Sequence, residues 1–100
     1  MAARLQIDRG RISELCRRYG IRKLSFFGSV LREDFRADSD VDVLVEFRPG
    51  ARTGFVIVDI EDELTQLFGG HKADLVSVKY LNERLRDRIL ATAEVQYAEG

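Results

Sequence analysis

Two aspartates separated by one residue, Asp40 and Asp42, are the side chains of this sequence best suited to hold a divalent cation. They open a strongly β-prone run, residues 40–47, and alternate residues of a strand project from one face with their backbones about 7 Å apart. Charge at the start of an otherwise apolar strand is costly to bury without compensation. Mg²⁺ prefers oxygen ligands and takes one or two carboxylates, with water and substrate phosphates completing its shell. The pair therefore indicates a magnesium site that contacts a phosphate-bearing substrate.

A glycine–serine turn precedes the aspartates and could hold that phosphate. Gly28 and Ser29 follow a β-rich run, residues 21–27, and stand before a short stretch that could be helical. Glycine permits close backbone approach, and a helix N-terminus offers unpaired N–H groups to an anion. The Ser29 hydroxyl could bond a terminal phosphate, and Arg32 could face the same anion. Each feature alone is typical of an ordinary turn, so the case depends on the order of the two motifs.

The elements that must position these residues form an alternating pattern of helices and strands. Apolar residues at helical spacing, β-rich runs and glycine stops predict helices at 8–19, 29–35, 56–68 and 81–97, and strands at 21–27, 40–47 and 72–78. The strand at 40–47 is apolar on both faces in its second half, as expected of a central strand. The pattern predicts an α/β fold, with a short mixed sheet of about three to four strands flanked by helices.

Length and composition limit the alternatives. The 100 residues fit one domain, 1–100, and 16 basic against 17 acidic side chains leave a net charge of −1. This balance does not favour direct nucleic-acid or membrane binding. No run of about 18 apolar residues occurs, so a cytoplasmic location is expected. The single cysteine, Cys16, has helical spacing with apolar neighbours and is interpreted as a core residue. A domain this small could shield apolar surface in a homo- or hetero-oligomer.

The two motifs together resemble a known family. Residues 28–32 (Gly-Ser-Val-Leu-Arg), followed by residues 39–45 (Ser-Asp-Val-Asp-Val-Leu-Val), resemble the signature of the minimal nucleotidyltransferases (MNT) of the DNA polymerase β-like superfamily. Asp74, on the run 73–77, matches the third carboxylate of that family. One departure is Glu33, which stands where many members have glycine.

The resemblance implies a role for each matching residue. By it, Gly28 and Ser29 would hold the triphosphate of ATP. The nucleotide side of the site would also include Arg32 and Ser39. The metal ligands and catalytic residues would be Asp40, Asp42 and Asp74. An ordinary interpretation of Asp74, as half of a surface ion pair, stays open.

The resemblance also implies a reaction and a partner. The reaction would be Mg²⁺-dependent transfer of AMP from ATP to a hydroxyl, and two cations about 4 Å apart would stabilise the attacking and departing oxygens. The partner would be a HEPN toxin, modified on a tyrosine, with this chain as the antitoxin of a type VII-like pair. Two alternatives stay open, namely an antitoxin that neutralises its toxin by binding alone and a small-molecule nucleotidyltransferase.

Overall fold

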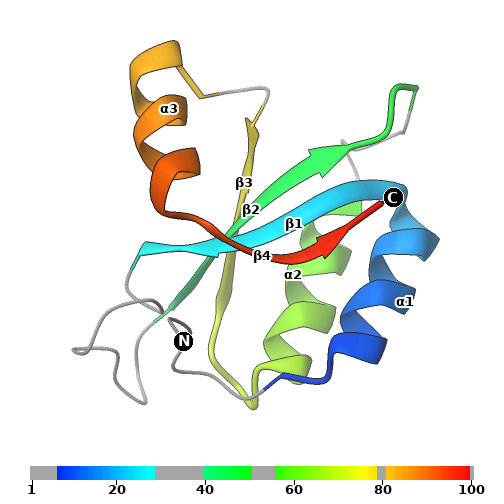
Figure 1. Ribbon diagram of the computed structural model, residues 1–100. Coiled ribbons are helices and arrows are strands. Elements are labelled where there is room, and N and C mark those ends of the chain that lie inside the picture. The colour runs from blue at the N-terminus through cyan, green and yellow to red at the C-terminus, as the bar shows by residue number, and fades with distance from the viewer. Residues whose placement is uncertain (1–6, 29–39, 51–55, 79–80, 100) are drawn as a thin grey trace.

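The computed structural model describes residues 7–28, 40–50, 56–78 and 81–99. In chain order the elements are α1 (Arg9–Tyr19), β1 (Ile21–Phe27), β2 (Val41–Phe47), α2 (Val56–Leu67), β3 (Ala73–Ser77), α3 (Glu83–Thr92) and β4 (Glu94–Ala98). The α/β fold expected from the sequence is confirmed, with a small sheet and flanking helices (Figure 1). The short helix predicted at 29–35 lies outside the described residues. Within the described part of the chain, no helix is long and apolar enough to cross a bilayer.

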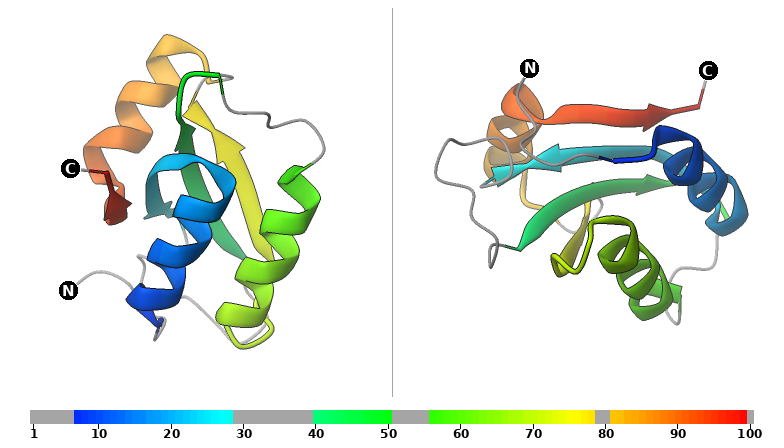
Figure 2. Two further views of the ribbon diagram at one scale, coloured as in Figure 1. Left: turned by 90° about the vertical axis from the view of Figure 1, so that its right-hand side faces the viewer. Right: turned by 90° about the horizontal axis from the view of Figure 1, so that it is seen from below.

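The four described strands form one mixed sheet in the order β3-β2-β1-β4. β1 pairs antiparallel with β2 and with β4, whereas β3 runs parallel to β2. β2 is therefore an interior strand, as its sequence predicted. α1 and α2 lie side by side against one face of the sheet, and α3 stands apart from them (Figure 2). Leu90 of α3 instead lines a small cavity together with Ser25 and Leu44, on the other face.

Local signals set the bounds of α1. The Asp8 side chain accepts a hydrogen bond from the backbone N–H of Arg11 at 3.2 Å, which satisfies one of the free donors of the first turn. Gly20 ends the helix in the left-handed conformation, with a φ of 72°. The helix buries Ile12 and Cys16 completely, so the prediction of Cys16 as a core residue is confirmed.

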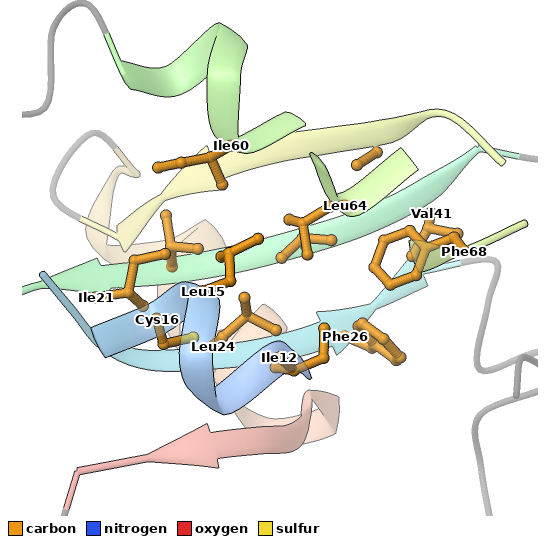
Figure 3. Packing of buried hydrophobic residues seen from close by; sticks show 13 residues of the cluster. Ile12, Leu15, Cys16, Ile21, Leu24, Phe26, Val41, Ile60, Leu64 and Phe68 are labelled. Atoms are coloured by element: carbon orange, nitrogen blue, oxygen red, sulfur yellow. The ribbon is translucent and has the colours of Figure 1, made fainter. Parts of the chain in front are cut away.

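The hydrophobic core fills the space between the sheet and the two helices α1 and α2 (Figure 3). Val41, Val43 and Val45 of β2 alternate into it. Phe68, just after α2, packs edge-to-face on Phe26 of β1, with ring centroids 5.5 Å apart. Since odd-numbered residues of β2 face the core, the even-numbered ones project from the opposite face of the sheet.

The C-terminal segment differs from its prediction. The pattern from residue 81 to residue 97 predicted one helix, but α3 ends at Thr92, and Ala93 adopts an extended backbone with a ψ of 140°. Tyr97 lies instead in β4, opposite Leu24 of β1. The prediction was wrong because β1 has a second edge whose backbone groups need partners, and pairing with β4 satisfies them.

Candidate active site

Asp42 and Asp74 lie next to each other on the sheet. They are direct partners in the parallel register of β2 and β3, and such strands run about 4.8 Å apart. Paired residues of neighbouring strands project from the same face, which here is the face opposite α1 and α2. Asp42 is half-buried and Asp74 is exposed. The sheet thus presents two carboxylates side by side where both water and a substrate can reach them.

Asp40 lies one residue before β2 and is exposed. Between the two aspartates, the backbone N–H of Val41 donates to the carbonyl oxygen of Lys72 at 2.8 Å, which joins the beginnings of β2 and β3. Asp40 is therefore held near the same end of the strands. Among the described residues, no three histidine, cysteine or carboxylate side chains form a group that could hold a metal ion. The full set of Asp40, Asp42 and Asp74 as ligands stays a prediction.

Gly28 lies against the Asp42 carboxylate. Its φ of +75° is in the left-handed region. A Cβ at this position would lie 3.3 Å from the Asp42 Cγ, and the Asp42 Oδ2 would be in steric conflict with it. The register places the preceding residue, Phe27, opposite Asp42, so the end of β1 brings the glycine here. Sequence reasoning assigned Gly28 to phosphate alone and missed that it leaves room for a carboxylate.

Comparison with known proteins identifies the family. Residues 10–97 match the model of the nucleotidyltransferase domain. The chain belongs to this family. It is 34% identical over 77 residues to the protein adenylyltransferase MntA of Thermococcus cleftensis. The aligned residues cover 77% of this chain and 76% of the relative. The resemblance to nucleotidyltransferases is confirmed, and the protein is an enzyme of this type.

Solved structures share the fold of this nucleotidyltransferase. A protein provisionally named as a minimal nucleotidyltransferase superimposes with a TM-score of 0.71 at 38% identity, covering 87% of this chain and 85% of that one. A complex of the tri-AMPylated Shewanella oneidensis HEPN toxin with an MNT antitoxin gives a TM-score of 0.64 at 16% identity, covering 90% and 69%. At that identity, the second likeness concerns the fold alone.

The remaining residues predicted for the nucleotidyltransferase site are Ser29, Arg32 and Ser39. All three lie outside the described residues, as does Glu33. The glycine–serine phosphate cradle is thus described only at Gly28, and its contact with a triphosphate stays a prediction.

The described site residues suit a hard cation. Asp42 and Asp74 supply carboxylate oxygens, the donors that Mg²⁺ prefers, and two carboxylates leave coordination positions for water and phosphate. The absence of a side chain at Gly28 leaves room for the Asp42 carboxylate at the end of β1. The donor set of these two carboxylates therefore fits Mg²⁺.

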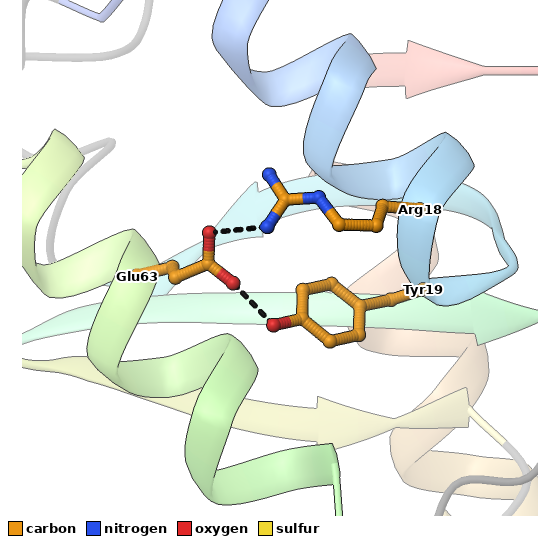
Figure 4. Close-up of polar contacts among 3 residues, drawn as sticks. All are labelled: Arg18, Tyr19 and Glu63. Carbon is orange, nitrogen blue, oxygen red and sulfur yellow. Dashed lines mark hydrogen bonds and ion pairs between the residues drawn. The ribbon is translucent and has the colours of Figure 1, made fainter.

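A second polar cluster lies on the helical side of the sheet (Figure 4). Glu63 of α2 accepts hydrogen bonds from the Tyr19 hydroxyl and from the Arg18 guanidinium of α1, the latter at 2.9 Å. The bond from Tyr19, followed by that from Arg18, holds the pKa of Glu63 below its ordinary value, and the same carboxylate raises the pKa of Tyr19. This cluster joins the two helices and lies on the opposite side of the sheet from Asp42 and Asp74.

Proposed function

We propose that this nucleotidyltransferase transfers AMP from ATP to a tyrosine hydroxyl of a HEPN toxin, with Mg²⁺ as cofactor, as the antitoxin of a type VII-like pair. The observation that carries the proposal is the direct register of Asp42 with Asp74. The relative from Thermococcus cleftensis, named a protein adenylyltransferase, supports AMP as the transferred group. The complex with a tri-AMPylated HEPN toxin supports the acceptor. We place the reaction in the cytoplasm.

The carboxylates would act together on the nucleotide. Asp42 would belong to both cation positions, shared with Asp40 on the triphosphate side and with Asp74 on the acceptor side. When bound, Mg²⁺ neutralises phosphate charge and stabilises the attacking and departing oxygens. Asp74 is exposed, so an acceptor hydroxyl can approach it from solvent.

The transfer itself exchanges one phosphorus–oxygen bond for another. The acceptor oxygen bonds to the α-phosphorus of ATP, the bond from this phosphorus to the bridging oxygen breaks, and pyrophosphate leaves with the electron pair. The acceptor proton passes to solvent. Gly28 leaves room for the Asp42 carboxylate beside the end of β1, because no side chain competes for its position.

The test is incubation of the chain with Mg²⁺, labelled ATP and a co-purified partner, followed by mass analysis of the partner. We expect the partner to gain AMP with the wild-type chain and with Asp62→Asn, a charge-removing control at an exposed position of α2. The double variant Asp40→Asn/Asp42→Asn should lose the transfer.

Two results would contradict the proposal. Neutralisation of the partner by the double variant, with no AMP added by any variant, would favour an antitoxin that acts by binding alone. Transfer of the label to a small acceptor in the absence of any partner protein would favour a small-molecule nucleotidyltransferase.

A further inference from the structure

The strand that carries Asp74 is held from outside by side chains of α2. β3 is an edge strand and pairs only with β2 among the described strands. The backbone N–H groups on either side of Asp74 nevertheless have partners. Ala73 donates to the Thr65 hydroxyl oxygen at 3.0 Å, and Leu75 donates to the Glu61 carboxylate at 3.0 Å. Two acceptors from one helix thus bracket the aspartate.

The two acceptors are coupled to each other. Glu61 and Thr65 are four positions apart on α2, which places them on the same side of the helix. The Thr65 hydroxyl donates to the Glu61 carbonyl oxygen at 2.7 Å, so its proton is engaged and a lone pair is free to accept from Ala73. The bond to the Glu61 carboxylate is charge-assisted and stronger than a neutral one. Both contacts with β3 are partly buried.

We propose that Glu61 and Thr65 are positioning residues for Asp74, and this role rests on the proposed function of Asp74 as a metal ligand. An edge strand is tied by a ladder on one side only, so its side chains can shift relative to the neighbouring strand. The two bonds from α2 tie the other side at the residues next to Asp74. They therefore keep its carboxylate in register with Asp42, without contacting cation or substrate themselves.

The test compares variants that remove each acceptor with variants that retain it. Thr65→Val and Glu61→Ala remove the acceptor, whereas Thr65→Ser and Glu61→Gln keep an oxygen in nearly the same place. Asp62→Ala is the control, because it removes an exposed acid from the same helix. Amide hydrogen exchange at residues 73 and 75 reports the two bonds independently of catalysis. Titration of Mn²⁺ in the presence of a non-hydrolysable ATP analogue reports the cation site.

Thr65→Val should speed amide hydrogen exchange at residue 73 alone, and Glu61→Ala should speed it at residue 75 alone, because each variant removes the acceptor of that one amide. They should also raise the Mn²⁺ concentration for half-saturation by about 10- to 100-fold, as is typical when residues that support metal ligands are changed. Thr65→Ser, Glu61→Gln and the control Asp62→Ala should behave like the wild type in both measurements. In all of these variants the KM for the partner protein should not change.

Faster exchange with unchanged Mn²⁺ affinity would overturn the positioning role and leave protection of the sheet edge as the function of the two bonds. Unchanged exchange in Thr65→Val and Glu61→Ala would also overturn it. Equal Mn²⁺ binding by the wild type and Asp74→Asn is a different result, since it would overturn the proposed function of Asp74 and with it the role of its supports.

Discussion

Gly28→Ala should separate the role of the glycine in backbone conformation from its role beside Asp42. A left-handed backbone costs a residue with a Cβ about 1–2 kcal/mol, and Gly28 has a φ of +75°. In a domain of this size, each kcal/mol lowers the Tm by about 4–8 °C. The added methyl group would also displace the Asp42 carboxylate, whose Cγ lies 3.3 Å from the Cβ position. We expect a modest loss of stability and a large loss of AMP transfer.

The chain offers matched controls for this prediction. Gly50 and Gly69 have φ values of +82° and +68°, and a Cβ at either position would meet nothing within 4 Å. Gly50→Ala and Gly69→Ala should therefore lose a similar amount of stability and keep transfer activity. Thermal unfolding and labelled-ATP transfer, measured below the Tm of all three variants, give the comparison. Equal activity in the three variants would refute the assignment of Gly28 to the Asp42 carboxylate.

Three further predictions concern the core and the helical face. The lowered pKa of Glu63 means that its bond from Tyr19 stabilises the fold above the ordinary glutamate pKa of 4.5, and that this stabilisation is lost as the pH falls through the lowered value. Tyr19→Phe should therefore destabilise the protein near neutral pH, and urea unfolding should show that the loss becomes smaller as the pH falls below 4.5. An equal loss at every pH would contradict this. Burial raises the pKa of the Cys16 thiol to about 12, so iodoacetamide should label this thiol only after the protein unfolds. Rapid labelling of the folded protein, detected by mass analysis, would contradict the burial of Cys16 in the core. Phe68→Ala removes the ring that packs on Phe26, so it should lower the free energy of unfolding in urea by about 3–5 kcal/mol. A loss below about 1 kcal/mol would show that the core around these two rings is not tightly packed.

Much of the fold follows from local signals in the sequence. Asp8 and Gly20 mark the two ends of α1, and the apolar run of β2 predicts an interior strand. The C-terminal segment could not be assigned in this way, because the apolar spacing up to Tyr97 also fits a helix. Whether these residues form a strand depends on the open edge of β1, which is a property of the assembled sheet.

The carboxylates of the candidate site could be identified from the sequence, but the contacts around them could not. Asp40 and Asp42 stand out by their spacing, and the resemblance to the family points to Asp74 as well. The parallel pairing of β2 with β3 places Asp74 beside Asp42, and the role of the three as metal ligands stays a prediction. The contact of Gly28 with Asp42 depends on the register of β1 with β2, which the sequence pattern does not determine. The bonds from α2 to the backbone of β3 depend on how the helix is rotated over the sheet. Such contacts between elements become visible only in three dimensions.

The central claim is that Asp42 and Asp74 share one cation with a bound nucleotide. Calorimetric titration of Mg²⁺ into the protein with a saturating non-hydrolysable ATP analogue tests it directly. We predict that Asp42→Asn and Asp74→Asn each weaken cation binding by at least the roughly 10- to 100-fold that is typical of changes to supporting residues. Cation affinity unchanged in both variants would contradict the account, because the paired carboxylates would then have no part in binding the metal.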